Sequence, residues 1–247
     1  FEYAYLINNK TIDPSFTSLT GSPLIDSRIL SVFSRASYDY KQTYMVTAVF
    51  RADGSSNFAP GKQWGFFPSI SGGWAMTNEN FMKVTKNWLD FLKIRASWGE
   101  NGNQSLNPFQ YLSTVSFNGA PFFKYSDKTK FDNGGYPNIM ANPDVSWETS
   151  AQTDIGFDAR LLNSKVGITF DWYNKLTKDW LIQAPILATD GTGAPYINGG
   201  DVQNRGYEIT VSWNDKVGEF NYGISANFTQ QKNEVNRIAN AEGLSLI

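Results

Sequence analysis

Cysteine and histidine are both absent from this sequence of 247 residues. Without cysteine, the chain has no disulfide, no thiol nucleophile and no thiolate metal site. Without histidine, it lacks the commonest general base and the commonest metal ligand. A hydrolase or a metalloenzyme would have to work with carboxylates, lysines and tyrosines alone, so we do not expect an enzyme.

A long apolar run and a surplus of charge are also missing. No stretch approaches the roughly 20 apolar residues that a membrane helix needs. Lys and Arg number 21 and Asp and Glu 23, which gives a net charge of −2 and no basic surplus for nucleic acid. The opening residues Phe1-Glu-Tyr3 lack an initiator Met and a signal sequence. We therefore expect no nucleic-acid partner, and we expect the chain to be an internal piece of a longer protein.

Aromatic residues, in contrast, make up 15% of the chain, and the dominant pattern is period-two alternation of apolar and polar residues. Such alternation is typical of a strand with one apolar and one polar face. In 44–53, for example, Tyr44, Val46 and Phe50 alternate with more polar neighbours. Eight strands are predicted in this way, at 32–40, 44–53, 69–77, 91–99, 151–161, 166–173, 207–213 and 220–228.

The connections between these segments alternate between short and long. Short ones are predicted at 41–43, 78–90, 162–165 and 214–219, and we expect Asn78 to cap a brief helix in the second of them. Long ones, rich in Gly, Asn, Pro and aromatic residues, are predicted at 54–67, 100–146 and 182–204. Tight turns on one side and long loops on the other are typical of outer-membrane barrels, whose long loops are extracellular. The pattern predicts an all-β fold, with 1–247 forming part of one transmembrane antiparallel β-barrel domain.

Alternation alone leaves a soluble β-sandwich open, because its strands also have one apolar face. Two features favour the barrel. The apolar face often ends in an aromatic residue, as an interfacial girdle requires. The opposite face carries charges of both signs at mid-strand, which suits a wet lumen. We expect the following charged residues to face the lumen: Arg35, Asp39, Arg51, Asp53, Lys93, Arg95, Asp154 and Asp158. A glycosidase pair of Asp154 and Asp158 is conceivable but unsupported.

An ordered series of motifs resembles the SusC/RagA family of TonB-dependent outer-membrane transporters. The series begins with Arg51-Ala-Asp-Gly-Ser-Ser-Asn-Phe58 and Trp64-Gly-Phe-Phe-Pro-Ser-Ile-Ser-Gly-Gly-Trp74. It continues, in order and with appropriate spacing, through Leu92-Lys-Ile-Arg-Ala-Ser-Trp-Gly-Glu-Asn-Gly-Asn-Gln104, Asn142-Pro-Asp-Val-Ser-Trp-Glu-Thr149, Thr153-Asp-Ile-Gly-Phe-Asp158, Asp171-Trp-Tyr-Asn-Lys-Leu-Thr-Lys-Asp179 and Val202-Gln-Asn-Arg-Gly-Tyr-Glu208. Each motif alone is weak, whereas the ordered series is specific. We expect most of these residues to be structural.

The resemblance implies a barrel of about 22 strands filled by an N-terminal plug, of which this chain supplies about eight strands and no plug. It also implies active uptake of oligosaccharides or peptides across the outer membrane. A SusD-like surface lipoprotein would capture the ligand, and TonB would act through the missing N-terminal part. The lumen-facing charges could then pair with the plug as well as with one another. The alternatives are a passive or adhesive outer-membrane barrel and a soluble carbohydrate-binding β-sandwich.

Two further predictions concern the loops. Aromatic residues of the longest loop could stack on sugar rings or contact the lipoprotein, although packing of the loop against its neighbours is the more common reason for such residues. They are Phe109, Tyr111, Phe117, Phe122, Phe123, Tyr125, Phe131 and Tyr136. The turns Asp132-Asn-Gly-Gly135 and Asp190-Gly-Thr-Gly193 could offer oxygens to Ca²⁺. Because such turns occur far more often without metal, no cofactor is expected.

Overall fold

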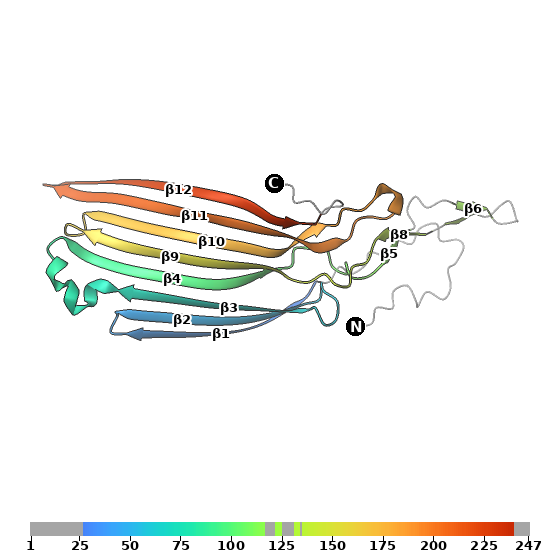
Figure 1. Ribbon diagram of the computed structural model, residues 1–247, viewed down its shortest axis with the longest axis horizontal. Helices are drawn as coiled ribbons and strands as arrows, with labels where there is room; N and C mark the ends of the chain where they lie inside the picture. Colours follow the sequence, from blue (N-terminus) through green and yellow to red (C-terminus); the bar gives the residue numbers. More distant parts are fainter. Residues whose placement is uncertain (1–26, 117–121, 125–130, 134, 240–247) are drawn as a thin grey trace.

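The chain forms one antiparallel sheet of eight long strands, arranged in chain order β1-β2-β3-β4-β9-β10-β11-β12 (Figure 1). The computed structural model describes residues 27–116, 122–124, 131–133 and 135–239. The strands are β1 (Ile29–Tyr40), β2 (Tyr44–Ser55), β3 (Trp64–Ala75), β4 (Leu89–Asn103), β9 (Glu148–Leu161), β10 (Val166–Gln183), β11 (Tyr196–Val217) and β12 (Phe220–Ile238). The predicted all-β fragment of a barrel with about eight antiparallel strands is confirmed.

The register places the apolar residues of neighbouring strands side by side on one face of the sheet. Phe157 of β9 lies opposite Ile94 of β4 and Phe170 of β10, and Ile209 of β11 continues the row to Phe228 of β12. We call this the apolar face and its opposite the polar face. The two further sheets of the described residues are two-stranded and belong to the connection 104–147.

The apolar face is exposed. Ile70 is 53% exposed, Ile224 70% and Phe228 58%. A soluble sandwich would bury this face against a second sheet, whereas a barrel turns it toward lipid. In the described part of the chain no helix is long and apolar enough to span a membrane.

Several strands extend further than the alternation predicts. β10, β11 and β12 have 18, 22 and 19 residues. Beyond the apolar band the regular alternation is lost; Gln203 and Asn204, for example, are polar neighbours on β11, whereas Leu181 and Ile182 are apolar neighbours on β10. Neighbouring residues of the same kind give no period-two signal. The predicted boundaries therefore stop where the apolar face stops.

The short connections all lie at one end of the sheet (Figure 1) and are joined by hydrogen bonds. We call the connections 41–43, 76–88, 162–165 and 218–219 the turn rim. Asn78 donates from Nδ2 to the carbonyl of Gln42 at 2.8 Å, and the amide of Leu162 donates to the carbonyl of Trp88 at 3.0 Å. Lys165 contacts Asp215 through its Nζ at 2.9 Å. The rim therefore holds the strand ends together without a hydrophobic core.

Connection 76–88 contains two 3₁₀-helices, η1 (Met76–Asn78) and η2 (Asn80–Thr85). The expectation that Asn78 caps a helix is wrong: neither helix has a side-chain cap, and Asn78 ends η1. Instead, its amide reaches the neighbouring turn. A third 3₁₀-helix, η3 (Ala188–Asp190), lies in the connection between β10 and β11.

Glu79, between η1 and η2, ties the rim to the apolar face. Its Oε1 accepts hydrogen bonds from the Tyr44 hydroxyl and, at 3.3 Å, from Trp74 Nε1. The rings of Tyr44 and Trp74 are stacked, with centroids 6.4 Å apart. One carboxylate therefore orients two girdle aromatics.

Glu79→Ala is expected to lower the free energy of unfolding by about 1 kcal/mol, because both aromatic donors lose their acceptor at a partly solvated site. The urea midpoint of the intact protein in proteoliposomes measures this. Glu219→Ala removes an exposed glutamate from another turn of the rim and serves as the control. Equal midpoints for the two variants would contradict the role of Glu79.

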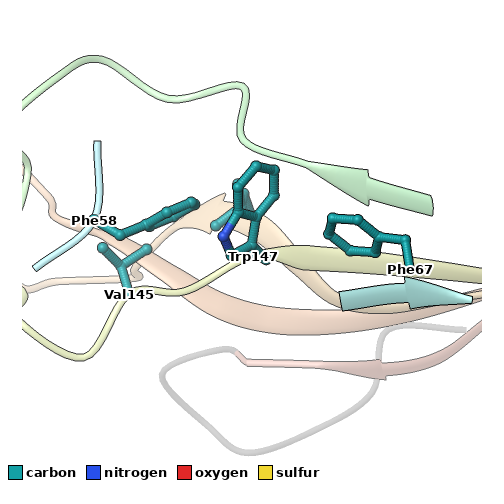
Figure 2. Packing of buried hydrophobic residues seen from close by; sticks show 5 residues of the cluster. Phe58, Phe67, Val145 and Trp147 are labelled. Atoms are coloured by element: carbon teal, nitrogen blue, oxygen red, sulfur yellow. The ribbon is translucent and has the colours of Figure 1, made fainter. Parts of the chain in front are cut away.

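A cluster of buried hydrophobic residues lies at the opposite end of the sheet, where the long connections meet the strands (Figure 2). We call this cluster the loop core, and its members are Phe58, Phe67, Val145, Trp147 and Leu181. Trp147 lies between two rings, with centroids 5.2 Å from Phe58 and 5.5 Å from Phe67. Phe58 and Val145 are fully buried. The cluster joins two long connections to the ends of β3 and β10.

Candidate functional site

Polar residues of three strands meet on the polar face around Arg95 of β4. Its Nε lies 3.0 Å from Asp158 Oδ2 on β9, and its Nη1 lies 2.7 Å from Asp171 Oδ1 on β10. These three side chains are roughly one-third exposed. One guanidinium therefore pairs with two carboxylates and links three neighbouring strands by charge-assisted hydrogen bonds.

The other predicted lumen-facing charges also have defined partners. Arg51 pairs with Asp53 at 2.7 Å and donates to Ser31 Oγ at 3.3 Å. Asp154 accepts a hydrogen bond from Ser97 Oγ at 3.2 Å. At the turn rim, Asp39 Oδ1 accepts from the amide of Gln42 at 2.8 Å.

Lys93 and Arg35 complete the predicted set. Lys93 lies opposite Asp158 in the register, and Arg35 lies on β1 opposite Val49. The structure thus brings Lys93, Arg95, Asp154 and Asp158 together, and leaves Arg35 and Asp39 apart on β1.

A shallow concavity of about 400 Å³ follows this part of the polar face. Its lining includes Lys93, Arg95, Ser97 and Asp154. Gly72, Gly73 and Gly156 also line it, and they have no side chains to fill the space. The lining offers donors, acceptors and both charges, which suits a polar protein surface better than an apolar ligand.

Asp171 was absent from the predicted set of lumen-facing charges, although it is the nearer carboxylate to Arg95. The signal was present, because Asp171 alternates with Phe170 and Trp172 on the polar face of its segment. Its partner could not be read from the sequence, since Arg95 belongs to another strand pair.

The structure places the predicted loop aromatics on several elements of the connection 104–147. Phe109 and Tyr111 contact each other, with ring centroids 6.3 Å apart. Tyr136 lies in β8 (Tyr136–Ile139), which pairs with β5 (Thr114–Ser116), and is 39% exposed. Phe122 and Phe123 lie in β6 (Phe122–Lys124), and Phe131 lies in β7 (Phe131–Asn133). Phe117 and Tyr125 lie outside the described residues.

The motif residues, in contrast, come together around the loop core. Trp147 donates from Nε1 to the carbonyl of Gln63 at 2.9 Å. The amide of Ser146 donates to Asn198 Oδ1 at 2.8 Å, and Asn198 Nδ2 returns a hydrogen bond to the Ser146 carbonyl at 3.0 Å. Glu148 accepts from Asn103 Nδ2 and from the amide of Leu181, both at 3.1 Å. These contacts hold the bases of the long connections against the strands.

The extended part of β10, β11 and β12 carries its own ion pairs. Arg237 of β12 lies 2.8 Å from Asp201 of β11 and 3.3 Å from Asp179 of β10. The hydrogen bonds and charge of Arg237 hold the pKa of Asp201 below its ordinary value, against the smaller opposing effect of burial. These pairs link the three strands beyond the apolar band.

The geometry around the two candidate Ca²⁺ turns gives no further reason to expect a metal there. No group of three or more acidic side chains with metal-binding geometry occurs among the described residues. Asp190 Oδ2 accepts from the amide of Leu187 at 3.1 Å and so caps its own turn. The other candidate turn includes Gly134, which lies outside the described residues. Ca²⁺ binding therefore stays an untested prediction.

Residues 1–246 match the family model described as "TonB dependent receptor-like, beta-barrel". The chain belongs to this family. Members of the family are outer-membrane β-barrels, which agrees with the exposed apolar face and the up-and-down strand order of this TonB-dependent receptor chain.

Curated relatives support a narrower relationship. The chain is 35% identical over 225 residues to TonB-dependent receptor P39 of Formosa agariphila, which covers 91% of this chain and 21% of the relative. It is 30% identical over 217 residues to TonB-dependent receptor SusC of Bacteroides thetaiotaomicron, covering 87% of this chain and 21% of SusC. The chain thus spans about a fifth of the length of these relatives.

Among solved structures, the RagAB peptide importer in its "closed-closed" state superposes with a TM-score of 0.75 at 26% identity, covering 85% of this chain and 22% of that one. The siderophore receptor PirA from Pseudomonas aeruginosa gives a TM-score of 0.55 at 16% identity, which reflects the shared fold alone. The predicted resemblance to the SusC/RagA family is therefore confirmed.

Proposed function

We propose that this chain forms part of the barrel wall of a TonB-dependent importer that takes up oligosaccharides or peptides with a SusD-like surface lipoprotein. The observation that carries the proposal is the superposition on the RagAB peptide importer, which is much closer than that on the siderophore receptor. Identity to SusC over most of the chain supports it independently. The relatives are receptors and transporters rather than enzymes.

The parts of the chain have different roles in this proposal. The apolar face contacts outer-membrane lipid. The polar face, with the Arg95 cluster at its centre, lines the lumen and contacts the plug that the resemblance implies. The loop core keeps the bases of the extracellular loops fixed, and the loop aromatics such as Tyr136 are proposed contacts for ligand or lipoprotein.

Uptake by cells carrying the intact transporter tests the proposal. Fluorescent oligosaccharides and peptides are added with and without a protonophore, which collapses the energy supply that TonB uses. We expect uptake of one ligand class to stop with the protonophore, and a lipoprotein to co-purify with the transporter in mild detergent. Deleting the transporter gene gives the background.

Uptake that persists unchanged with the protonophore would instead favour a passive barrel. Cell adhesion without uptake would favour an adhesin. The soluble sandwich is already excluded, because the chain belongs to a barrel family and its apolar face has no second sheet in the described residues.

A further inference from the structure

The apolar face does not end where the strands end. At the turn rim, the ring of Phe81 in η2 packs edge-on against Trp74, with centroids 6.4 Å apart. Trp74 belongs to the apolar face, where it stacks on Tyr44. The connection 76–88 therefore extends the apolar face beyond the last strand residues, on the side that the barrel turns toward lipid.

The short helix η2 is amphipathic. A 3₁₀-helix has three residues per turn, so residues three apart lie above one another. Phe81 and Val84 share one side and are 59% and 84% exposed. Asn80 and Lys83 share another side, and both are exposed. The third side holds Met82 and Thr85, which are half-buried.

Exposed apolar residues continue along the same connection, and basic ones accompany them. Trp88 is 50% exposed, and Lys86 follows η2. Of the acidic groups at this position, Glu79 is bound to Tyr44 and Trp74, and Asp90 accepts a hydrogen bond from the amide of Ser164 at 2.8 Å. Aromatic and aliphatic groups on one side with lysines on another are typical of segments that lie in a membrane interface.

We propose that the connection 76–88 is an interfacial anchor in the phospholipid leaflet next to the tight turns, which in outer-membrane barrels is the periplasmic one. Phe81, Val84 and Trp88 insert between the acyl chains near the headgroups. Lys83 and Lys86 extend along the surface to the lipid phosphates, as long basic side chains do at such interfaces. Asn78 donates a hydrogen bond to the Gln42 carbonyl of one neighbouring turn, and the Trp88 carbonyl accepts one from the Leu162 amide of the other, which keeps the segment at a fixed depth.

Lipid fits this surface better than a protein partner does. The exposed apolar groups of η2 are continuous with the apolar face, which itself contacts lipid. A separate protein surface would have to begin within this continuous apolar surface. The proposal rests on the membrane setting of the family, and it is independent of what the transporter carries.

Site-directed spin labelling measures the depth directly, and the chain has no cysteine of its own. Val84→Cys and the control Asn80→Cys are made as single-cysteine variants of the intact transporter, with any cysteine outside this chain replaced by serine. They are labelled with a nitroxide and reconstituted in vesicles of phosphatidylethanolamine and phosphatidylglycerol. Power saturation with oxygen, which partitions into lipid, and with a water-soluble nickel chelate reports the environment of each label.

We expect the oxygen-to-nickel accessibility ratio to be severalfold higher for the label at position 84 than for the label at position 80. Equal ratios would overturn the proposal, because η2 would then lie in water. Shielding of position 84 from both reagents would also overturn it, since a protein surface would then cover the site. Folding is verified by heat-dependent migration in gels. Protonophore-insensitive uptake would refute the proposed function while leaving the accessibility ratios unaffected.

Discussion

Trp147→Ala is expected to lower the free energy of unfolding by about 3–5 kcal/mol, the usual cost of removing a buried tryptophan from a packed cluster. The indole lies between Phe58 and Phe67 and donates to the carbonyl of Gln63. Its loss would release two long connections at once, because Phe58 belongs to one and Trp147 ends the other. Denaturant unfolding of the intact transporter in proteoliposomes gives the energy, and protease cleavage of the extracellular loops on cells gives the structural effect.

Trp98→Ala is the matched control, since Trp98 lies on the apolar face and is 39% exposed. Trp98→Ala should lower the free energy of unfolding by less than Trp147→Ala does, and it should leave the loops protected from protease. Trp147→Phe keeps a ring in the cluster but loses the N–H donor and part of the ring volume, so a loss of about 1–2 kcal/mol is expected. If Trp147→Ala and Trp98→Ala give the same midpoint and the same protease pattern, the loop core does not anchor the loops.

Arg95→Leu is the second substitution with a large expected effect, about 2 kcal/mol of destabilisation. Removing one partner of a fully buried ion pair costs about 3–5 kcal/mol, and partial exposure reduces that figure here. The variant leaves Asp158 and Asp171 on the polar face without their shared cation. Glu208 lies opposite Asp171 in the register and adds a further negative charge.

The double variant Arg95→Leu/Asp171→Asn tests this explanation. It should recover part of the lost stability, because one of the unpaired carboxylates is gone. The single variant should also lose less stability at high salt, which screens the repulsion between the remaining carboxylates. Strict additivity of the two substitutions would show that Arg95 acts through packing and not through charge.

The band of strands that faces lipid could be predicted because each residue there has a definite face. Val46, Ile94 and Ile209 lie on the apolar face that the alternation assigned to them. The first half of β11, in contrast, has no regular alternation, and only its hydrogen-bonded partners reveal it as a strand.

The candidate site divides in the same way. The faces of Arg95 and Asp158 follow from local alternation, but the Asp171 contact depends on which strands are neighbours. Likewise, the motif residues Phe58 and Trp147 could be identified as structural from their surroundings. That they contact each other depends on the folding of two long loops with no periodicity. Pairings across loops are set by tertiary packing, which a single sequence does not display.

The unequal strand lengths give the barrel wall an uneven height. At about 3.3 Å per residue and a tilt of about 40°, the 22 residues of β11 rise about 55 Å along the barrel axis, against about 30 Å for the 12 residues of β1. The hydrocarbon-facing band of such barrels is only about 25 Å tall. On the β10–β12 side, roughly half of the wall thus extends beyond the hydrocarbon-facing band. On the β1–β3 side, the strands extend only slightly beyond it. The extracellular margin formed by this chain therefore slopes down from β11 to β1.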